Sequence, residues 1–133
     1  MKKKIVEICP CGNQQTYMQC CAPYHQGNKK PTTAEALMRS RYTAFVFELK
    51  DYLLVTWHSS TRPKQLQFEP NTIWLGLKVK ACEAGLQDDN QGMVSFVARY
   101  KIQGKAHRLI ENSRFIKQQE QWFYVDADVE ENV

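Results

Sequence analysis

The sequence predicts an α+β fold in which an antiparallel sheet packs on a long N-terminal helix, preceded by a short cysteine-rich segment. Three observations indicate this. Apolar residues recur at helical spacing between positions 34 and 49. From residue 73 onward the apolar period changes to two, with turn residues between the runs. Helices followed by a strand meander are typical of an α+β domain with helix on one sheet face.

The first segment holds four of the five cysteines of the chain, at Cys9, Cys11, Cys20 and Cys21. Two sulfurs two positions apart can bind one ion if the chain between them turns, and Pro10 and Gly12 favour such a turn. Zinc prefers four ligands in a tetrahedron. Since four thiolates leave no open position, the sequence predicts a closed, structural zinc site.

Two other interpretations compete with zinc. Cys9 or Cys11 could form a disulfide with Cys20 or Cys21, or the four thiols could be unrelated. A disulfide needs an oxidising compartment, and the start of the chain shows no export signal. No apolar run is long enough to span a bilayer. We therefore expect a cytoplasmic protein with reduced thiols.

The charge balance gives little support for nucleic-acid binding. The formal net charge is 18 − 14 = +4. Four thiols that lose protons to one zinc ion would change it to 4 − 4 + 2 = +2. Lysines at positions 2–4, 29 and 30 lie near the cysteine-rich segment in the sequence. They could offset the negative charge of its zinc-bound thiolates, or they could simply be solvated in a terminus and a linker.

At 133 residues, the chain suits one domain and a small appendage. We assign residues 1–25 to the knuckle and 26–133 to the α+β domain, with a polar linker over 26–31. Metal binding should supply most of the folding free energy of the knuckle. We expect Tyr24 to pack it onto the domain.

A capping box, Thr32-Thr33-Ala34-Glu35, predicts a helix from there to about Glu48. Arg41 falls within the apolar stripe and should point inward, whereas Arg39 should lie nearer solvent. A buried guanidinium is costly unless paired, so Arg41 should meet an acid. The stripe comprises Ala34, Leu37, Met38, Tyr42, Phe45 and Leu49.

A second short helix is expected from Asp51 to Trp57, and a brief extended piece at 66–68. Four strands should follow, starting at Ile73 and ending at Asp126, with turns at 88–90, 104–105 and 118–120. Cys82 should share a face with Lys78 and Lys80 as a lone thiol. In the third strand, Glu111 shares the phase of Leu109, Ser113 and Phe115.

The knuckle resembles the SEC-C motif, the small zinc element of the translocase ATPase SecA. The resemblance rests on Cys9-Pro10-Cys11-Gly12, Tyr17 and Cys20-Cys21. The continuation is similar to YchJ-like bacterial proteins, through stretches such as Leu37-Met38-Arg39-Ser40-Arg41-Tyr42 and Glu111-Asn112-Ser113-Arg114-Phe115. This resemblance implies a cystatin-like (nuclear transport factor two-like) cone, a curved sheet over a long helix. The family usually carries a Ser-Gly-Lys turn where this chain has Asn13-Gln14-Gln15.

A second candidate site is a pocket in the cone, lined by Arg41, Tyr42, Trp57, His58 and Glu111. Arg41 and Glu111 should form a buried ion pair. Such a pocket could hold a small molecule, or the pair could simply lock helix to sheet. No nucleophile is evident, so we expect no catalytic residue.

The favoured function is a zinc-binding protein-interaction module, as the SEC-C resemblance implies. The alternatives are a small-molecule binder or enzyme that uses the cone, and a nucleic-acid or ribosome-associated protein. The sequence leaves open whether the chain forms a homo-oligomer.

Overall fold

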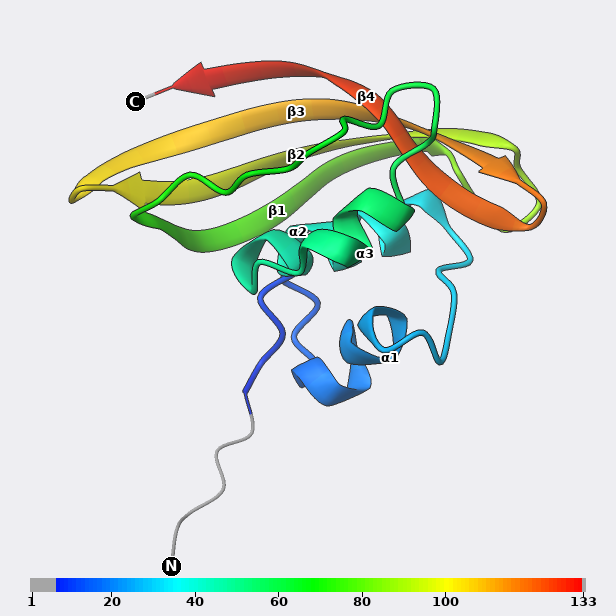
Figure 1. Cartoon of the computed structure of the whole chain (residues 1–133), viewed down its shortest axis with the longest axis horizontal. Coiled ribbons are helices and arrows are strands. Elements are labelled where there is room, and N and C mark those ends of the chain that lie inside the picture. Colours follow the sequence, from blue (N-terminus) through cyan, green and yellow to red (C-terminus); the bar gives the residue numbers. More distant parts are fainter. Residues whose placement is uncertain (1–6, 133) are drawn as a thin grey trace, which may run out of the picture.

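The structure is a computed structural model that describes residues 7–132 (Figure 1). The lysines at positions 2–4 lie outside the described residues. In chain order the elements are η1 (Tyr17–Gln19), α1 (Ala22–His25), α2 (Ala34–Val46), α3 (Lys50–Val55), β1 (Thr72–Ala84), β2 (Gln91–Ile102), β3 (Lys105–Gln118) and β4 (Gln121–Asn132).

The four strands form one antiparallel sheet in the order β1-β2-β3-β4, which confirms the predicted fold class. The sheet curves, and the helices gather on one side of it (Figure 1). Two-residue turns join β2 to β3 at Gln103-Gly104 and β3 to β4 at Gln119-Glu120. All four residues have positive φ, from 52° to 81°. That conformation matches the right-handed twist of the strands in tight hairpins.

Two bulges in β1 shift the predicted strand phase. The register slips between Trp74 and Gly76 and again between Val79 and Ala81. Leu75, which lies at the first slip, is 41% exposed. Cys82 pairs with the buried Val94 and so faces the helices, which corrects its predicted place beside the lysines.

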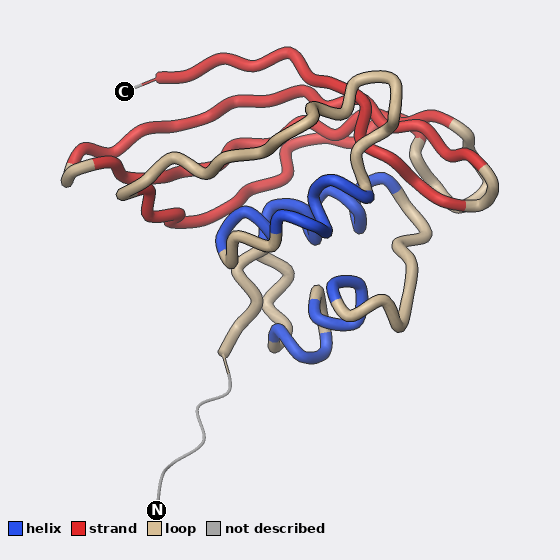
Figure 2. Tube along the Cα trace, in the orientation of Figure 1, coloured by secondary structure: helices blue, strands red, loops and turns tan. Residues whose placement is uncertain are grey.

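Helix α2 lies between the sheet and the knuckle (Figure 2). Its N-cap is Thr33, whose side chain accepts a hydrogen bond from the Ala36 amide at 3.0 Å. It ends at Val46, two residues before the predicted end. Leu37, Met38 and Tyr42 pack into the main core, as predicted. Ser40 and Thr43 are also buried, which one apolar stripe does not predict; they lie on the side toward the knuckle and α3.

Helix α3 spans 50–55 instead of the predicted 51–57. The residues that follow α3 run beside β4, where the His58 amide donates to the Tyr124 carbonyl at 2.8 Å. The Tyr124 amide donates to the Thr56 carbonyl at 2.9 Å. These bonds fix Trp57 next to Tyr124. Residues 66–68 form no strand, and Phe68 contacts the ring of Phe45.

Candidate functional site

The knuckle is built from a tight loop followed by two short helical turns. Ile8 bridges to Thr16, and the Cys9 amide donates to the Gln15 carbonyl at 2.7 Å, so the first two cysteines lie at a hairpin tip. Gly12 has a φ of 87°, and an added Cβ would lie 2.9 Å from the Leu77 carbonyl oxygen of β1. Glycine is therefore required for this close approach. Gln14 in the same loop is also left-handed, with a φ of 61°.

The four thiols converge, as their spacing predicts. The sulfurs of Cys9, Cys11, Cys20 and Cys21 all lie within 4.8 Å of one another. The Sγ atoms of Cys11 and Cys20 are 3.5 Å apart, and those of Cys20 and Cys21 are 4.0 Å apart. Zinc–sulfur bonds of about 2.3 Å in a tetrahedron place sulfurs about 3.8 Å apart. The four residues therefore fit a zinc ion. A disulfide would need about 2.05 Å, and all four cysteines are free.

Four thiolates this close together need a cation among them. Hydrogen bonding to Cys11 and then to Cys9, together with burial, raises the pKa of the Cys21 thiol. Adjacent buried sulfurs resist becoming thiolates together, because each new negative charge repels the others. A divalent ion removes this penalty and deprotonates its ligands. Two polar side chains support the sulfurs: the Asn13 amide donates to Cys20 at 3.8 Å, and the Thr43 hydroxyl lies 3.6 Å from Cys9.

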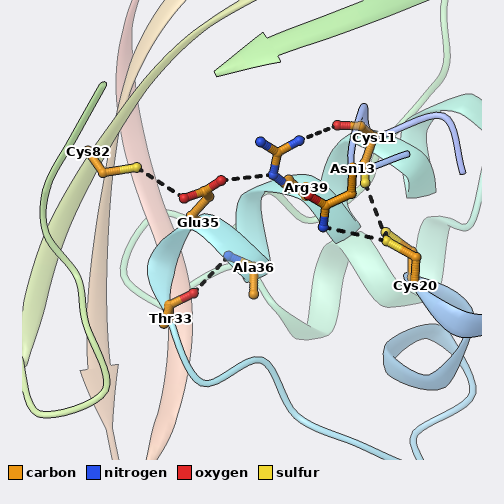
Figure 3. Close-up of polar contacts among 9 residues, drawn as sticks. Cys11, Asn13, Cys20, Thr33, Glu35, Ala36, Arg39 and Cys82 are labelled. Atoms are coloured by element: carbon orange, nitrogen blue, oxygen red, sulfur yellow. Dashed lines mark hydrogen bonds and ion pairs between the residues drawn. The ribbon is translucent and has the colours of Figure 1, made fainter. Parts of the chain in front are cut away.

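A chain of polar contacts fastens the knuckle to α2 and β1 (Figure 3). Arg39 Nη1 donates to the Cys11 carbonyl oxygen at 2.6 Å, and its Nε donates to Glu35 at 2.9 Å. The Cys82 thiol contacts the other oxygen of Glu35 at 3.5 Å. Arg39 lies nearer solvent than the buried Arg41, as predicted, but its side chain is only 15% exposed. The knuckle covers what would otherwise be the solvent face of α2.

His25 makes a second set of contacts between the knuckle and α2, and the sequence analysis did not predict it. Its Nε2 lies 2.8 Å from the Ser40 carbonyl oxygen, and its Nδ1 lies 2.7 Å from the Tyr17 hydroxyl. Since a carbonyl only accepts, Nε2 carries the proton and Nδ1 accepts from Tyr17. Burial lowers the pKa of His25, which agrees with a neutral ring. The neighbouring Tyr24, predicted to dock the knuckle, is half-buried.

On the sheet side of α2, a cavity of about 180 Å³ lies between the helices and the sheet. Four of the predicted pocket residues, Arg41, Tyr42, Trp57 and Glu111, line this cavity. His58 does not line it. Its ring nitrogens lie 2.7 Å from the Ser60 hydroxyl and 3.0 Å from the Gln118 side chain. The remaining lining residues are Met38, Phe45, Trp74, Phe96, Ala98, Leu109, Ser113, Phe115 and Tyr124.

Arg41 is buried, with 6% of its surface exposed, but the predicted ion pair is wrong. Among the side chains that the structure describes, no carboxylate pairs with it. Its Nη1 donates to the Leu53 carbonyl and the Thr56 hydroxyl, each at 2.7 Å. The guanidinium carbon lies 5.1 Å from the Trp57 ring centre and 4.6 Å from that of Tyr124. These dipoles and π faces replace the missing acid, and burial lowers the pKa of Arg41 to about 10.

Glu111 faces the same cavity from β3. Its Oε1 accepts a hydrogen bond from the Ser113 hydroxyl at 2.9 Å. Burial raises the pKa of Glu111, which outweighs the opposing effects of Ser113 and Arg41. The cavity is therefore lined by one cation on α2 and one titratable acid on β3.

Known proteins share both parts of this architecture. A family model described as "YchJ, middle NTF2-like domain" matches residues 33–127. A UPF0225 protein of Chromobacterium violaceum is 48% identical over 130 residues, covering 95% of this chain and 96% of its own length. A UPF0225 protein of Bordetella pertussis is 49% identical over 126 residues, covering 91% and 92%.

Two solved structures are similar as well. The solution structure of a SEC-C motif containing protein from Rhodopseudomonas palustris has a TM-score of 0.80 and 27% identity, covering 92% of this chain and 98% of that one. The crystal structure of a SEC-C motif containing protein from Psychrobacter arcticus has a TM-score of 0.75 and 28% identity, covering 90% and 81%.

Fold and site together define a SEC-C type cysteine knuckle joined to an NTF2-like α+β domain. The chain belongs to the YchJ-like family. In the described part of the chain, no helix is both long enough and apolar enough to cross a membrane.

Proposed function

We propose that this chain is a zinc-binding protein-interaction module of the bacterial cytoplasm. Its knuckle, residues 1–25, would hold zinc through Cys9, Cys11, Cys20 and Cys21, and residues 26–133 would form the domain that carries it. The observation that supports this most is the convergence of four free thiols at distances that fit one tetrahedral ion. A reducing compartment would keep them available for the metal.

The proposed role is recognition rather than chemistry, because four protein sulfurs leave zinc no open position. The knuckle instead offers a surface. Ile8 is 61% exposed and Met18 is 65% exposed, both on the knuckle. Methionine adapts well to apolar partner surfaces, and exposed apolar residues beside a rigid scaffold are typical of a binding patch.

Quantitative affinity capture with the native protein and three variants would test this proposal. The double variant Cys9→Ser/Cys11→Ser should lose both zinc and the captured protein. The double variant Ile8→Ser/Met18→Ser should keep zinc and lose the same protein. The control Leu86→Ser removes a residue that is 66% exposed on the distant β1–β2 loop and should keep both. Capture that is equal for all variants would contradict an interaction through the knuckle.

The cavity supports a second candidate function, a small-molecule binder. A buried guanidinium and a half-buried carboxyl group that face one apolar cavity are costly to maintain unless all their hydrogen-bonding groups are satisfied. Pockets of this composition, mostly apolar with a few polar groups, are typical of ligand sites.

A further inference from the structure

The cavity between α2 and the sheet is lined by Arg41, whose guanidinium uses only part of its hydrogen-bonding capacity within the described residues. Both hydrogen bonds that Arg41 donates come from Nη1, and the side chain is more than nine-tenths buried. Within the described part of the chain, Nε and Nη2 donate to no protein acceptor. These two nitrogens form one edge of the planar fork, which matches both oxygens of a carboxylate. The neighbouring rings of Trp57 and Tyr124 hold the fork in place.

The size and lining of the cavity set the rest of the ligand. In another protein, an apolar cavity of about 150 Å³ admits benzene. This one, at about 180 Å³, has room for a ring or a branched chain with small polar substituents. Phe45, Trp74, Phe96 and Phe115 contribute aromatic walls. A ligand body must therefore be apolar and compact.

Glu111 adds a second polar requirement. It already accepts from Ser113, and it faces the cavity that Arg41 faces. A carboxylate has more lone pairs than one hydroxyl satisfies, so it can accept another donor. A ligand hydroxyl or amino group, placed across the ring from the ligand carboxylate, would supply that donor.

We propose that this cavity binds a small monocarboxylic acid that has a compact apolar body and a hydroxyl or amino donor. The acid group pairs with Arg41, and the donor reaches Glu111. The proposal rests on the cavity function suggested above and adds the class of ligand.

Isothermal titration calorimetry with the zinc-loaded protein tests the proposal, using benzoate, 4-hydroxybenzoate, benzyl alcohol and benzylamine. The two acids should bind at least tenfold more tightly than the alcohol or the amine, and 4-hydroxybenzoate more tightly than benzoate. Arg41→Lys keeps the charge but loses the fork. It should weaken both acids about tenfold, a typical loss for a bidentate contact, while leaving the alcohol unchanged. Glu111→Gln should reduce the advantage of the hydroxylated acid.

Two further variants separate binding from general damage. Ala98→Leu fills the cavity from β2, where Ala98 is 1% exposed, and should abolish acid binding without touching Arg41. Arg114→Gln, an exposed arginine paired with Asp126 and Asp128, should bind like the native protein. Binding of the alcohol or amine as tightly as the acids would overturn the carboxylate class and leave a cavity binder. No binding of any probe below about 10 mM would overturn both.

Discussion

Arg39 on α2 donates its Nη1 proton to the backbone carbonyl of Cys11, at 2.6 Å, and thereby joins the cysteine loop of the knuckle to the long helix of the domain. The contact is largely shielded, because the arginine side chain is 15% exposed. A second shielded contact, from His25 to the Ser40 carbonyl, lies on the other side of the knuckle. The knuckle is thus fixed to the domain at two points and is not a freely tethered finger.

Arg39→Gln should loosen this attachment. The change removes a charged donor from a buried carbonyl, which typically costs about 1.5–3 kcal/mol. Chemical denaturation of the zinc-loaded protein should show a loss of that order, with faster hydrogen exchange in residues 8–21. Arg114→Gln removes an arginine whose partners are exposed, so it should change stability less. Equal losses in the two variants would mean that Arg39 does not fasten the knuckle.

Gly12→Ala tests the close approach of the knuckle to β1. The added Cβ would lie 2.9 Å from the Leu77 carbonyl oxygen, at a backbone φ of 87°. Gly27 has a similar φ of 80° but nothing within 4 Å, so Gly27→Ala carries the backbone cost alone. Thermal and chemical unfolding should show Gly12→Ala to be less stable than Gly27→Ala by about 1–3 kcal/mol, a usual cost of overpacking. Matching stabilities would indicate that the loop does not press on the strand.

His25→Phe should separate the hydrogen bonds of His25 from its packing. Phenylalanine can keep the edge contact with the Tyr52 ring, 4.8 Å between ring centres, but leaves the Ser40 carbonyl and Tyr17 hydroxyl without their partner. A loss of about 1–3 kcal/mol in unfolding free energy is expected. His107→Phe, where the histidine stacks on Tyr100 and the new ring can do the same, is the matched control and should be close to neutral. The reverse order of effects would contradict this role.

Glu111→Gln should stabilise the protein at neutral pH. Burial raises the pKa of Glu111 in the folded state above its unfolded value of about 4.3, despite the opposing charge of Arg41. The folded state therefore holds the proton more tightly, and native stability falls as pH rises through the window between the two pKa values. The stability gained by the variant should grow across that window, measured by denaturation at several pH values. Glu130→Gln, on the exposed end of β4, controls for the loss of one negative charge. A gain that shrinks with rising pH would contradict a raised pKa.

Much of this architecture could be predicted from local patterns. The clustering of Cys9 to Cys21, the capping signal in Thr32 to Glu35 and the period-two runs are all local, and the fold class they indicate is confirmed. The helix cap is Thr33, one residue later than the capping box predicts. The predicted alternation of side chains between the two sheet faces fails at the two bulges of β1, near Leu75 and Lys80. An inserted residue leaves no clear mark in an alternating sequence pattern.

The misplaced side chains share another cause. Arg39 is less exposed than its position on the helix suggests, because the knuckle that covers it comes from a separate part of the chain. Arg41 was predicted to need an acid, but carbonyl, hydroxyl and two aromatic faces contributed by α3 and β4 stabilise it instead. The docking histidine could have been suspected from its place four residues after Cys21. In each case, the decisive contact joins residues far apart in sequence.

The most direct test of the proposed zinc site is X-ray absorption at the zinc edge, on protein purified without chelators. The account predicts one zinc ion per chain, with a first shell of four sulfurs at about 2.3 Å and no nitrogen or oxygen ligand. A shell that contains nitrogen or oxygen, fewer than four sulfurs, or no bound zinc at all would contradict it.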